Sequence, residues 1–204
     1  KNKDILLLTE SQADELVKEL DSGEWTVTKI DEKPRTSYPK PPFTTSTLQQ
    51  EAARKLRSSA RETMRMAQQL YENGFITYMR TDSTHLSEEA IAGSRQIIQD
   101  SYGDDYLPGK ATRYETKVKN AQEAHEAIRP AHREFRSLLD VQKILDEKAS
   151  KLYDLIWKRT VASQMMPAKL KQTSVTIQNQ KSEFRATGQI ILFPGYMRVY
   201  VEGR

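Results

Sequence analysis

Hydrophobic residues recur every three to four positions through the middle of the chain, a pattern typical of amphipathic helices. Leu48, Ala52 and Leu56 follow this spacing after Ser46-Thr47-Leu48-Gln49, a sequence that resembles a helix-capping pattern. Gly74 closes another such run, because glycine readily adopts the left-handed conformation that ends helices. The helices predicted in this way begin near Thr9, Ser46 and Ser87 and cover about residues 63–73, 121–128 and 147–165.

Both ends of the chain show a two-residue alternation instead, which is typical of half-buried strands. The strands predicted in this way cover residues 1–8, 25–30, 171–177, 184–186, 190–192 and 196–201. The C-terminal strands need partners, and the N-terminal strands can supply them. We therefore predict an α+β fold in which a helical domain, residues 44–165, is inserted into a β-rich domain split between residues 1–43 and 166–204. The proline-rich stretch 33–42 marks the boundary.

Composition narrows the class of protein. The chain has 204 residues and no cysteine, which excludes disulfides, thiolate zinc sites and cysteine nucleophiles. No apolar run approaches the ~20 residues of a membrane-spanning helix. The net charge is only +4, but basic residues concentrate between Lys33 and Arg65. This concentration is compatible with weak contact to single-stranded DNA and equally with a solvated face. The chain starts without Met and stops within a strand-like pattern, as expected of an excised fragment.

Candidate chemistry begins in residues 74–83, Gly-Phe-Ile-Thr-Tyr-Met-Arg-Thr-Asp-Ser. Aromatic and β-branched residues predict extended chain here, which places Ile76, Tyr78, Arg80 and Asp82 on one side. A phenol with an ordinary pKa of about 10 is a poor nucleophile near neutral pH, but a neighbouring guanidinium favours the phenolate and stabilises charge on a phosphate. The same local pattern is also typical of a strand end with one buried Tyr and one solvated Arg.

A second candidate region is residues 122–130, Gln-Glu-Ala-His-Glu-Ala-Ile-Arg-Pro. On a helix, Gln122, His125 and Arg129 share one face. His125 could then donate to a phosphate oxygen or help to transfer a proton, and Arg129 could hold a nucleic-acid backbone. The alternative is a surface helix with a hydrogen-bonded histidine. Metal ligands are sparse, since no Asp-x-Asp occurs anywhere in the chain. Divalent cations that act on phosphates usually need clustered carboxylates.

Residues 74–83 resemble the active-site motif of type IA DNA topoisomerases. Residues 42–50, Pro-Phe-Thr-Thr-Ser-Thr-Leu-Gln-Gln, and residues 122–130 resemble two further motifs of that family, in the family's order and with similar spacing. The similarity covers about residues 40–200. Met79, between the candidate tyrosine and arginine, is more similar to the bacterial topoisomerase I branch than to topoisomerase III.

The resemblance implies a catalytic set of Tyr78, Arg80 and His125. Tyr78 would attack single-stranded DNA, leaving a 5′-phosphotyrosine link, and the break would be resealed without ATP after strand passage. Arg80, His125 and Arg129 would bind DNA, although Glu123 and Arg129 are carried over from the family only weakly. The family fold implied is part of a toroid, in which a β-rich arch accompanies a helical domain bearing the tyrosine.

The resemblance also implies partners. Mg²⁺ would be held in the full-length enzyme by an acidic domain of the same polypeptide that is missing here, so the chain alone is expected to be inactive. The location implied is the bacterial cytoplasm, on the chromosome. The alternative function is a non-catalytic, single-stranded-DNA-binding helical module whose tyrosine stacks on a base.

Overall fold

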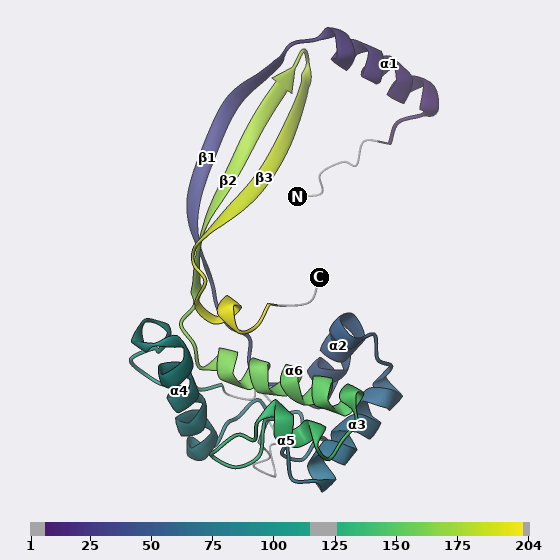
Figure 1. The fold of residues 1–204 in the computed structure, drawn as a ribbon. Coiled ribbons are helices and arrows are strands. Elements are labelled where there is room, and N and C mark those ends of the chain that lie inside the picture. The colour runs from purple at the N-terminus through teal and green to yellow at the C-terminus, as the bar shows by residue number, and fades with distance from the viewer. Residues whose placement is uncertain (1–6, 115–125, 202–204) are drawn as a thin grey trace. The chain divides into compact units, whose positions relative to one another are not determined.

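The computed structural model describes residues 7–114 and 126–201 (Figure 1). The chain forms two compact units. The first consists of residues 1–35 and 169–192, and the second of residues 36–168 and 193–204. Within the described ranges, no helix is long and apolar enough to cross a membrane.

The first unit combines one helix with a sheet whose strand order is β1-β2-β3. Its elements are α1 (Glu10–Ser22), β1 (Trp25–Ser37), β2 (Ala168–Asn179) and β3 (Ser182–Phe193), of which the strands run at one end into the second unit. Thr9 caps α1 through the capping box with Gln12, which confirms that predicted helix start. Asn179 donates from its side chain to the carbonyl of Leu20, 2.9 Å away, and so ties α1 to the turn of the β2-β3 hairpin.

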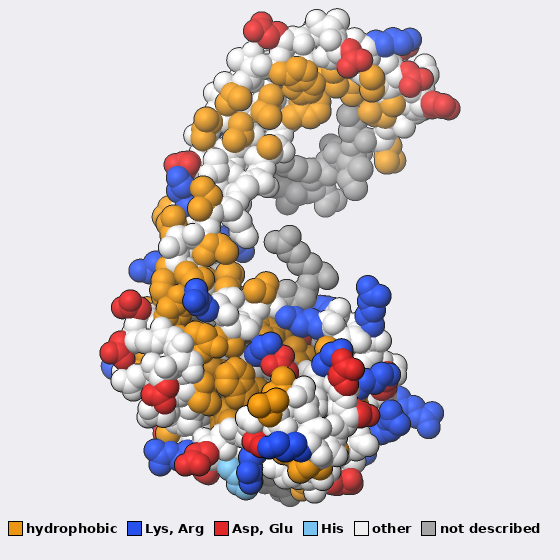
Figure 2. All heavy atoms as spheres, viewed as in Figure 1, with side chains coloured by type: hydrophobic (Ala, Val, Ile, Leu, Met, Phe, Trp, Pro, Cys, Tyr) orange, Lys and Arg blue, Asp and Glu red, His pale blue; other side chains and the backbone are white. Residues whose placement is uncertain are grey.

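Much of the apolar surface of the first unit stays exposed. Figure 2 shows hydrophobic side chains gathered along the visible face of the sheet. The large exposed ones on its strands are Trp25, Val27, Ile30, Phe184, Ile190, Ile191 and Leu192. Because α1 contributes no buried residue, the sheet is stabilised mainly by its backbone hydrogen bonds and by side-chain contacts between neighbouring strands, such as the ring contact of Trp25 with Phe184.

The second unit is helical, with α6 at its centre. Its elements are α2 (Thr45–Leu56), α3 (Ala60–Glu72), α4 (Glu88–Tyr102), the 3₁₀ turn η1 (Asp104–Tyr106), α5 (Leu138–Gln142), α6 (Glu147–Ser163) and the 3₁₀ turn η2 (Gly195–Arg198). α6 contacts α2, α3, α4 and α5. Leu152 and Ile156 of α6 are fully buried among Leu48, Leu70 and Ile98 of its neighbours. Burial of this apolar surface is the main stabilising contribution, at roughly 25 cal/mol per Å².

The α+β fold class predicted from the sequence is confirmed, since the N-terminal strand β1 pairs with the C-terminal strand β2. β1 is longer than predicted and includes Pro34. Proline is tolerated there because β1 is an edge strand and need not donate a hydrogen bond on its outer side. The two short strands predicted near Phe184 and Ile190 are a single strand, β3.

Several predicted elements were wrong. Residues 126–130 are not helical, because Ile128 forms an isolated β-bridge with Phe43 and Pro130 forms one with Ile76. Residues 115–125 of the predicted helix lie outside the described residues. The strand expected at 196–201 is instead the 3₁₀ turn η2 and an irregular tail.

Two further differences concern where elements begin. Leu7 and Leu8 belong to no strand, and the rest of the strand expected at 1–8 lies outside the described ranges. The cap of α2 is Thr44, whose partner is Thr47, two residues before the predicted cap.

Candidate functional site

The segment that carries Tyr78 runs between α3 and α4 without regular secondary structure. α3 ends as predicted at Gly74, which has a φ of +70°. The amide of Phe75 donates to the carbonyl of Leu70, 2.9 Å away, which satisfies one of the carbonyls left open at the helix end. This turn directs the chain away from α3 and into the extended segment.

Side chains alternate between interior and solvent along this segment. Those that point inward are Met79, Thr81 and Ser83, all buried. Those that point outward are Tyr78, Arg80 and Asp82, all exposed. The predicted shared face is therefore present for these three residues and wrong for Ile76, which is 2% exposed and bridges to Pro130. Tyr78 is 43% exposed, so its hydroxyl is accessible to a substrate.

Thr45, in the first turn of α2, holds one side of the extended segment. Its hydroxyl oxygen lies 2.8 Å from the carbonyl oxygen of Met79 and 3.1 Å from that of Thr81, and it accepts from the amide of Thr81 at 2.9 Å. The amide of Thr45 also donates to the Thr81 carbonyl, 2.9 Å away. Because these bonds flank Arg80, they fix the backbone from which its side chain projects. Thr45 thus ties residues 42–50 to residues 74–83 by hydrogen bonds, and Phe43 and Leu48 share a buried cluster with Phe75, Ile76 and Met79.

Replacing Thr45 with Val is expected to destabilise the second unit by about 1–3 kcal/mol, because the change removes the hydroxyl and leaves the Met79 carbonyl without its donor. Thr45→Ser, which keeps the hydroxyl, is the matched control. Urea unfolding measures the loss, and amide exchange at Thr81 tests where it occurs. Equal stability of the Val and Ser variants would contradict this role for Thr45.

Thr77 holds the segment from its other side. Its hydroxyl donates to the carbonyl of Ala127 at 2.7 Å and accepts from the amide of Arg129 at 3.0 Å. The backbones also pair, since the amide of Thr77 donates to the carbonyl of Arg129 at 2.9 Å and that of Ala131 donates to the carbonyl of Phe75 at 2.8 Å. Three segments therefore meet around Tyr78: residues 42–50, residues 74–83 and the described part of residues 122–130.

Arg129 is occupied inside the protein. It is 6% exposed, and its guanidinium donates to the carboxylate of Glu126 at 3.0 and 2.5 Å and to the hydroxyl of Ser87 at 3.2 Å. The same group also donates to the carbonyls of Pro130 and His132. This placement disagrees with the prediction that Arg129 binds DNA, because its donors face protein acceptors and little of the side chain reaches solvent. The other residues predicted from that stretch, Gln122, Glu123 and His125, lie outside the described residues.

Tyr78 has an aromatic neighbour that the local sequence pattern does not reveal. The ring of Tyr71, in the last turn of α3, lies edge-on to the ring of Tyr78, with centroids 5.3 Å apart and an interplanar angle of 67°. Such pairs contribute about 0.5–1.5 kcal/mol beyond their area burial. The seven-residue separation across a helix end gives no periodic signal that would have predicted this contact. Tyr71 therefore restricts where the Tyr78 ring can lie.

Two other tyrosines, Tyr114 and Tyr153, are poorer nucleophile candidates. Burial raises the pKa of Tyr114 to about 12, and its hydroxyl donates to the carbonyl of Ser163 at 3.0 Å. Burial also raises the pKa of Tyr153, whose hydroxyl donates to the carbonyl of Arg136 at 2.6 Å. By contrast, the Tyr78 hydroxyl and the Arg80 guanidinium make no hydrogen bond or ion pair with any residue the structure describes. Within the described residues, both groups therefore lack a competing protein partner.

The residues present do not fit a metal ion. Among residues 7–114 and 126–201, no three or more His, Asp or Glu side chains gather as ligands for one. Asp82, the acid beside Arg80, is exposed. A Mg²⁺ ion that bridges phosphate oxygens needs carboxylates or substrate oxygens around it.

Comparison with known proteins gives a consistent set of relatives. A family model described as DNA topoisomerase matches residues 1–204. "DNA topoisomerase 1" of Synechocystis is 54% identical over 202 residues, covering 99% of this chain and 22% of that protein. "DNA topoisomerase 1" of Mycobacterium tuberculosis is 50% identical over 209 residues, covering 99% and 22%. The structure of full-length topoisomerase I from Thermotoga maritima matches with a TM-score of 0.78 and 34% identity, covering 100% of this chain and 36% of that one. The chain thus spans about a fifth of the length of these curated relatives.

Proposed function

The chain belongs to the bacterial DNA topoisomerase I family, and from this premise we propose that it carries the nucleophile of a type IA DNA topoisomerase. The observation that supports this most is the outward face of the segment at Tyr78. A phenol and a guanidinium two residues apart project into solvent from a backbone fixed on one side by Thr45 and on the other by Thr77. A fixed backbone lowers the entropic cost of bringing a nucleophile to its target.

The proposed reaction is a transesterification on single-stranded DNA. The Tyr78 oxygen attacks the phosphorus, the phenol proton leaves, and the bond to the 3′-oxygen breaks. The products are a 5′-phosphotyrosine and a 3′-hydroxyl that has gained a proton. The reverse attack reseals the strand after another strand has passed, and no ATP is needed because the covalent link conserves the phosphodiester bond. Removal of negative supercoils is the expected outcome.

Arg80 is proposed to bind the phosphate under attack. Its fork of donors can contact two phosphate oxygens at once, and its charge favours both the phenolate and the charge that develops on phosphorus. Tyr71 is proposed as a positioning residue, because its edge contact limits rotation of the Tyr78 ring. His125 stays a predicted partner at the phosphate, since it lies outside the described residues.

Mg²⁺ and its ligands are proposed to belong to an acidic domain outside these 204 residues. The support is that the chain covers only 22% of its relatives and that its described side chains do not form a metal site. The whole enzyme is proposed to act on DNA in the bacterial cytoplasm. The proposed division of these 204 residues stays that of a β-rich domain, residues 1–43 and 166–204, and a helical domain, residues 44–165.

The chain alone is therefore expected not to relax supercoiled DNA, whereas a chimera should. In the chimera, these residues replace the corresponding segment of the Synechocystis relative, to which they are 54% identical. Relaxation of plasmid DNA with added Mg²⁺, followed on a gel, is the measurement. The unaltered relative is the positive control. Relaxation by the purified chain alone would contradict the proposal that it needs another domain.

The alternative is a non-catalytic module whose Tyr71 and Tyr78 rings stack on bases. The exposed edge-to-face pair is compatible with stacking, which contributes about 1–3 kcal/mol per base. Denaturation separates the two functions, because a stacked strand dissociates from the protein and a phosphotyrosine link does not.

A further inference from the structure

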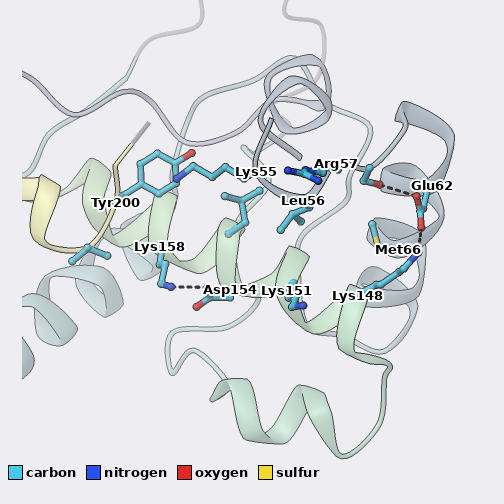
Figure 3. A pocket seen from close by; sticks show the side chains of 13 residues that line it. Lys55, Leu56, Arg57, Glu62, Met66, Lys148, Lys151, Asp154, Lys158 and Tyr200 are labelled. Atoms are coloured by element: carbon cyan, nitrogen blue, oxygen red, sulfur yellow. Dashed lines mark hydrogen bonds and ion pairs between the residues drawn. The ribbon is translucent and has the colours of Figure 1, made fainter. Parts of the chain in front are cut away.

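A second concave site lies in the helical unit, away from Tyr78. It has a volume of about 640 Å³ and is lined by the end of α2, the turn after it, the first half of α3, one face of α6 and the chain after η2 (Figure 3). Its polar side chains include Lys55, Arg57, Glu62, Lys148, Lys151, Asp154 and Lys158. Its apolar side chains include Leu56, Met66, Leu155 and Val199. We call this site the α2-α6 cavity.

Positive charge exceeds negative charge in the α2-α6 cavity. Five lysines and arginines line it, against two acids. Lys148 pairs with Glu62 at 2.6 Å and Lys158 with Asp154 at 2.6 Å, as the dashed contacts in Figure 3 show. The hydrogen bond from Lys148 and its charge lower the pKa of the Glu62 carboxyl, which keeps both partners charged. These two ion pairs use both lining acids, and the remaining cations are Lys55, Arg57 and Lys151.

The two remaining lysines also have acidic partners, but these acids do not line the cavity. Lys55 lies over the ring of Tyr200, 4.3 Å from its centroid, donates to the carbonyl of Val201, and is 4.0 Å from a carboxylate oxygen of Glu51. Lys151 pairs with Glu147 of its own helix at 2.7 Å, an exposed contact that water weakens. Both ammonium groups can therefore still attract an anion that enters the cavity.

The backbone at Arg57 supports a role for its side chain. Arg57 ends α2 in the left-handed region, with a φ of 54°. Glycine or asparagine is usual at such a helix end, and another residue type costs on the order of 1–2 kcal/mol there. The guanidinium makes no hydrogen bond or ion pair with any residue that the structure describes. An arginine in this conformation, with all its donors open at the rim of a basic cavity, indicates that its guanidinium serves a ligand (Figure 3).

The α2-α6 cavity and Tyr78 lie on different sides of α3. Glu62 lines the cavity, and Tyr71, which packs against Tyr78, comes nine residues later on the same helix. Nine residues correspond to a rotation of about 180° and a rise of about 14 Å. The nucleotides at the reacting phosphate therefore cannot be the ones that occupy the cavity.

We infer that the α2-α6 cavity binds phosphate groups of single-stranded DNA, at a stretch of nucleic acid separate from the one attacked by Tyr78. Arg57, Lys55 and Lys151 contact the phosphates, and the apolar floor accommodates sugar or base. A concave basic surface with low-dielectric walls concentrates positive potential, which favours a polyanion. This inference rests on DNA being the substrate, as proposed above, and adds a second contact to it.

The test is binding of a fluorescent oligothymidylate to the 204-residue chain at several salt concentrations, measured by anisotropy. The double variant Arg57→Asn/Lys151→Gln removes two cavity charges, and Asn tolerates the left-handed backbone at residue 57. Its plot of log K against log salt should be shallower by about 1.4, since each phosphate contact on a single strand contributes about 0.7. Lys110→Gln/Lys143→Gln removes two exposed charges of the helical unit that do not line the cavity and lie outside the basic stretch 33–65, so it should leave the slope nearly unchanged.

Either of two results would overturn the inference. One is an equal change of slope in the cavity and control variants, which would make the attraction a general surface effect. The other is a combination of two observations: pyrophosphate competes at micromolar concentration, and oligothymidylate binding does not depend on residues 57 and 151. That combination would make the cavity a site for a free anion. Thermal unfolding of each variant confirms that the fold is kept.

The outcome is independent of the reaction at Tyr78, because no strand is cleaved in this assay. A chimera that forms a covalent adduct while the cavity variants bind DNA normally would overturn only the second contact. If the slopes change as expected but the chimera forms no adduct, the results would support phosphate binding in the α2-α6 cavity and contradict the proposal that Tyr78 is the nucleophile.

Discussion

Tyr78→Phe is expected to abolish the covalent protein–DNA adduct and to leave DNA binding intact. The substitution removes only the oxygen that would attack phosphorus, and the ring can still pack edge-on against Tyr71. Removal of a covalent nucleophile lowers turnover by a factor on the order of 10⁶ in other enzymes, which here means no detectable product. The measurement uses the chimera with an end-labelled single-stranded oligonucleotide, denatured with detergent before electrophoresis.

Tyr71→Phe is the matched control, because it removes the same atom from the neighbouring ring and keeps the aromatic pair. It should still form the adduct. Peptide mapping should place the label on residue 78 in the unaltered chimera. Persistence of the adduct in Tyr78→Phe would mean that another residue is the nucleophile.

Arg80→Ala belongs to the same experiment. It should lower the cleavage rate about 10²- to 10³-fold, the usual effect of removing one donor to a developing oxyanion, without affecting stability. Stability is unaffected because Arg80 is exposed and its side chain does not hold the segment, whose supporting bonds come from Thr45 and Thr77. A rate equal to that of the unaltered chimera would exclude Arg80 from the reaction.

Arg129→Ala is expected to destabilise the helical unit by about 3–5 kcal/mol. The change leaves the carboxylate of Glu126 partly buried without its cation, and it leaves the carbonyls of Pro130 and His132 without a donor. The same extended stretch supports Thr77, so the backbone at Tyr78 should loosen as well. Chemical denaturation, with the midpoint and slope both fitted, measures the loss.

Lys143→Ala is the control for the loss of one cation. Its ion pair with Asp140 is exposed, so the change should cost no more than about 1 kcal/mol. Arg129→Lys should recover only part of the stability, because one ammonium cannot reach Glu126, Ser87 and both carbonyls at once. Weaker DNA binding by Arg129→Ala at unchanged stability would contradict the structural role and restore the DNA contact predicted from the sequence.

Hydrophobic periodicity by itself determined most of the helices, and the extended pattern of residues 74–83 predicted that Tyr78, Arg80 and Asp82 share one side. Gly74 ends α3 with a positive φ as predicted, and Tyr78, Arg80 and Asp82 project to the same side. These features depend on neighbours within a few residues, so the local pattern contains them. Family motifs added the identity of the nucleophile, which stays a prediction.

Tertiary structure alone decided what surrounds that segment. Helical spacing placed Arg129 on an exposed helix face, yet bridges to Phe43 and Ile76 draw residues 128–130 into extended chain and bury the arginine. Thr45, Tyr71 and the cations of the α2-α6 cavity also acquire their roles from partners distant along the chain or beyond a helix end. Local periodicity indicates which face of an element is apolar, but it does not indicate which other element covers that face. The supports of Tyr78 could therefore not be found from the sequence, whereas the side that it shares with Arg80 could.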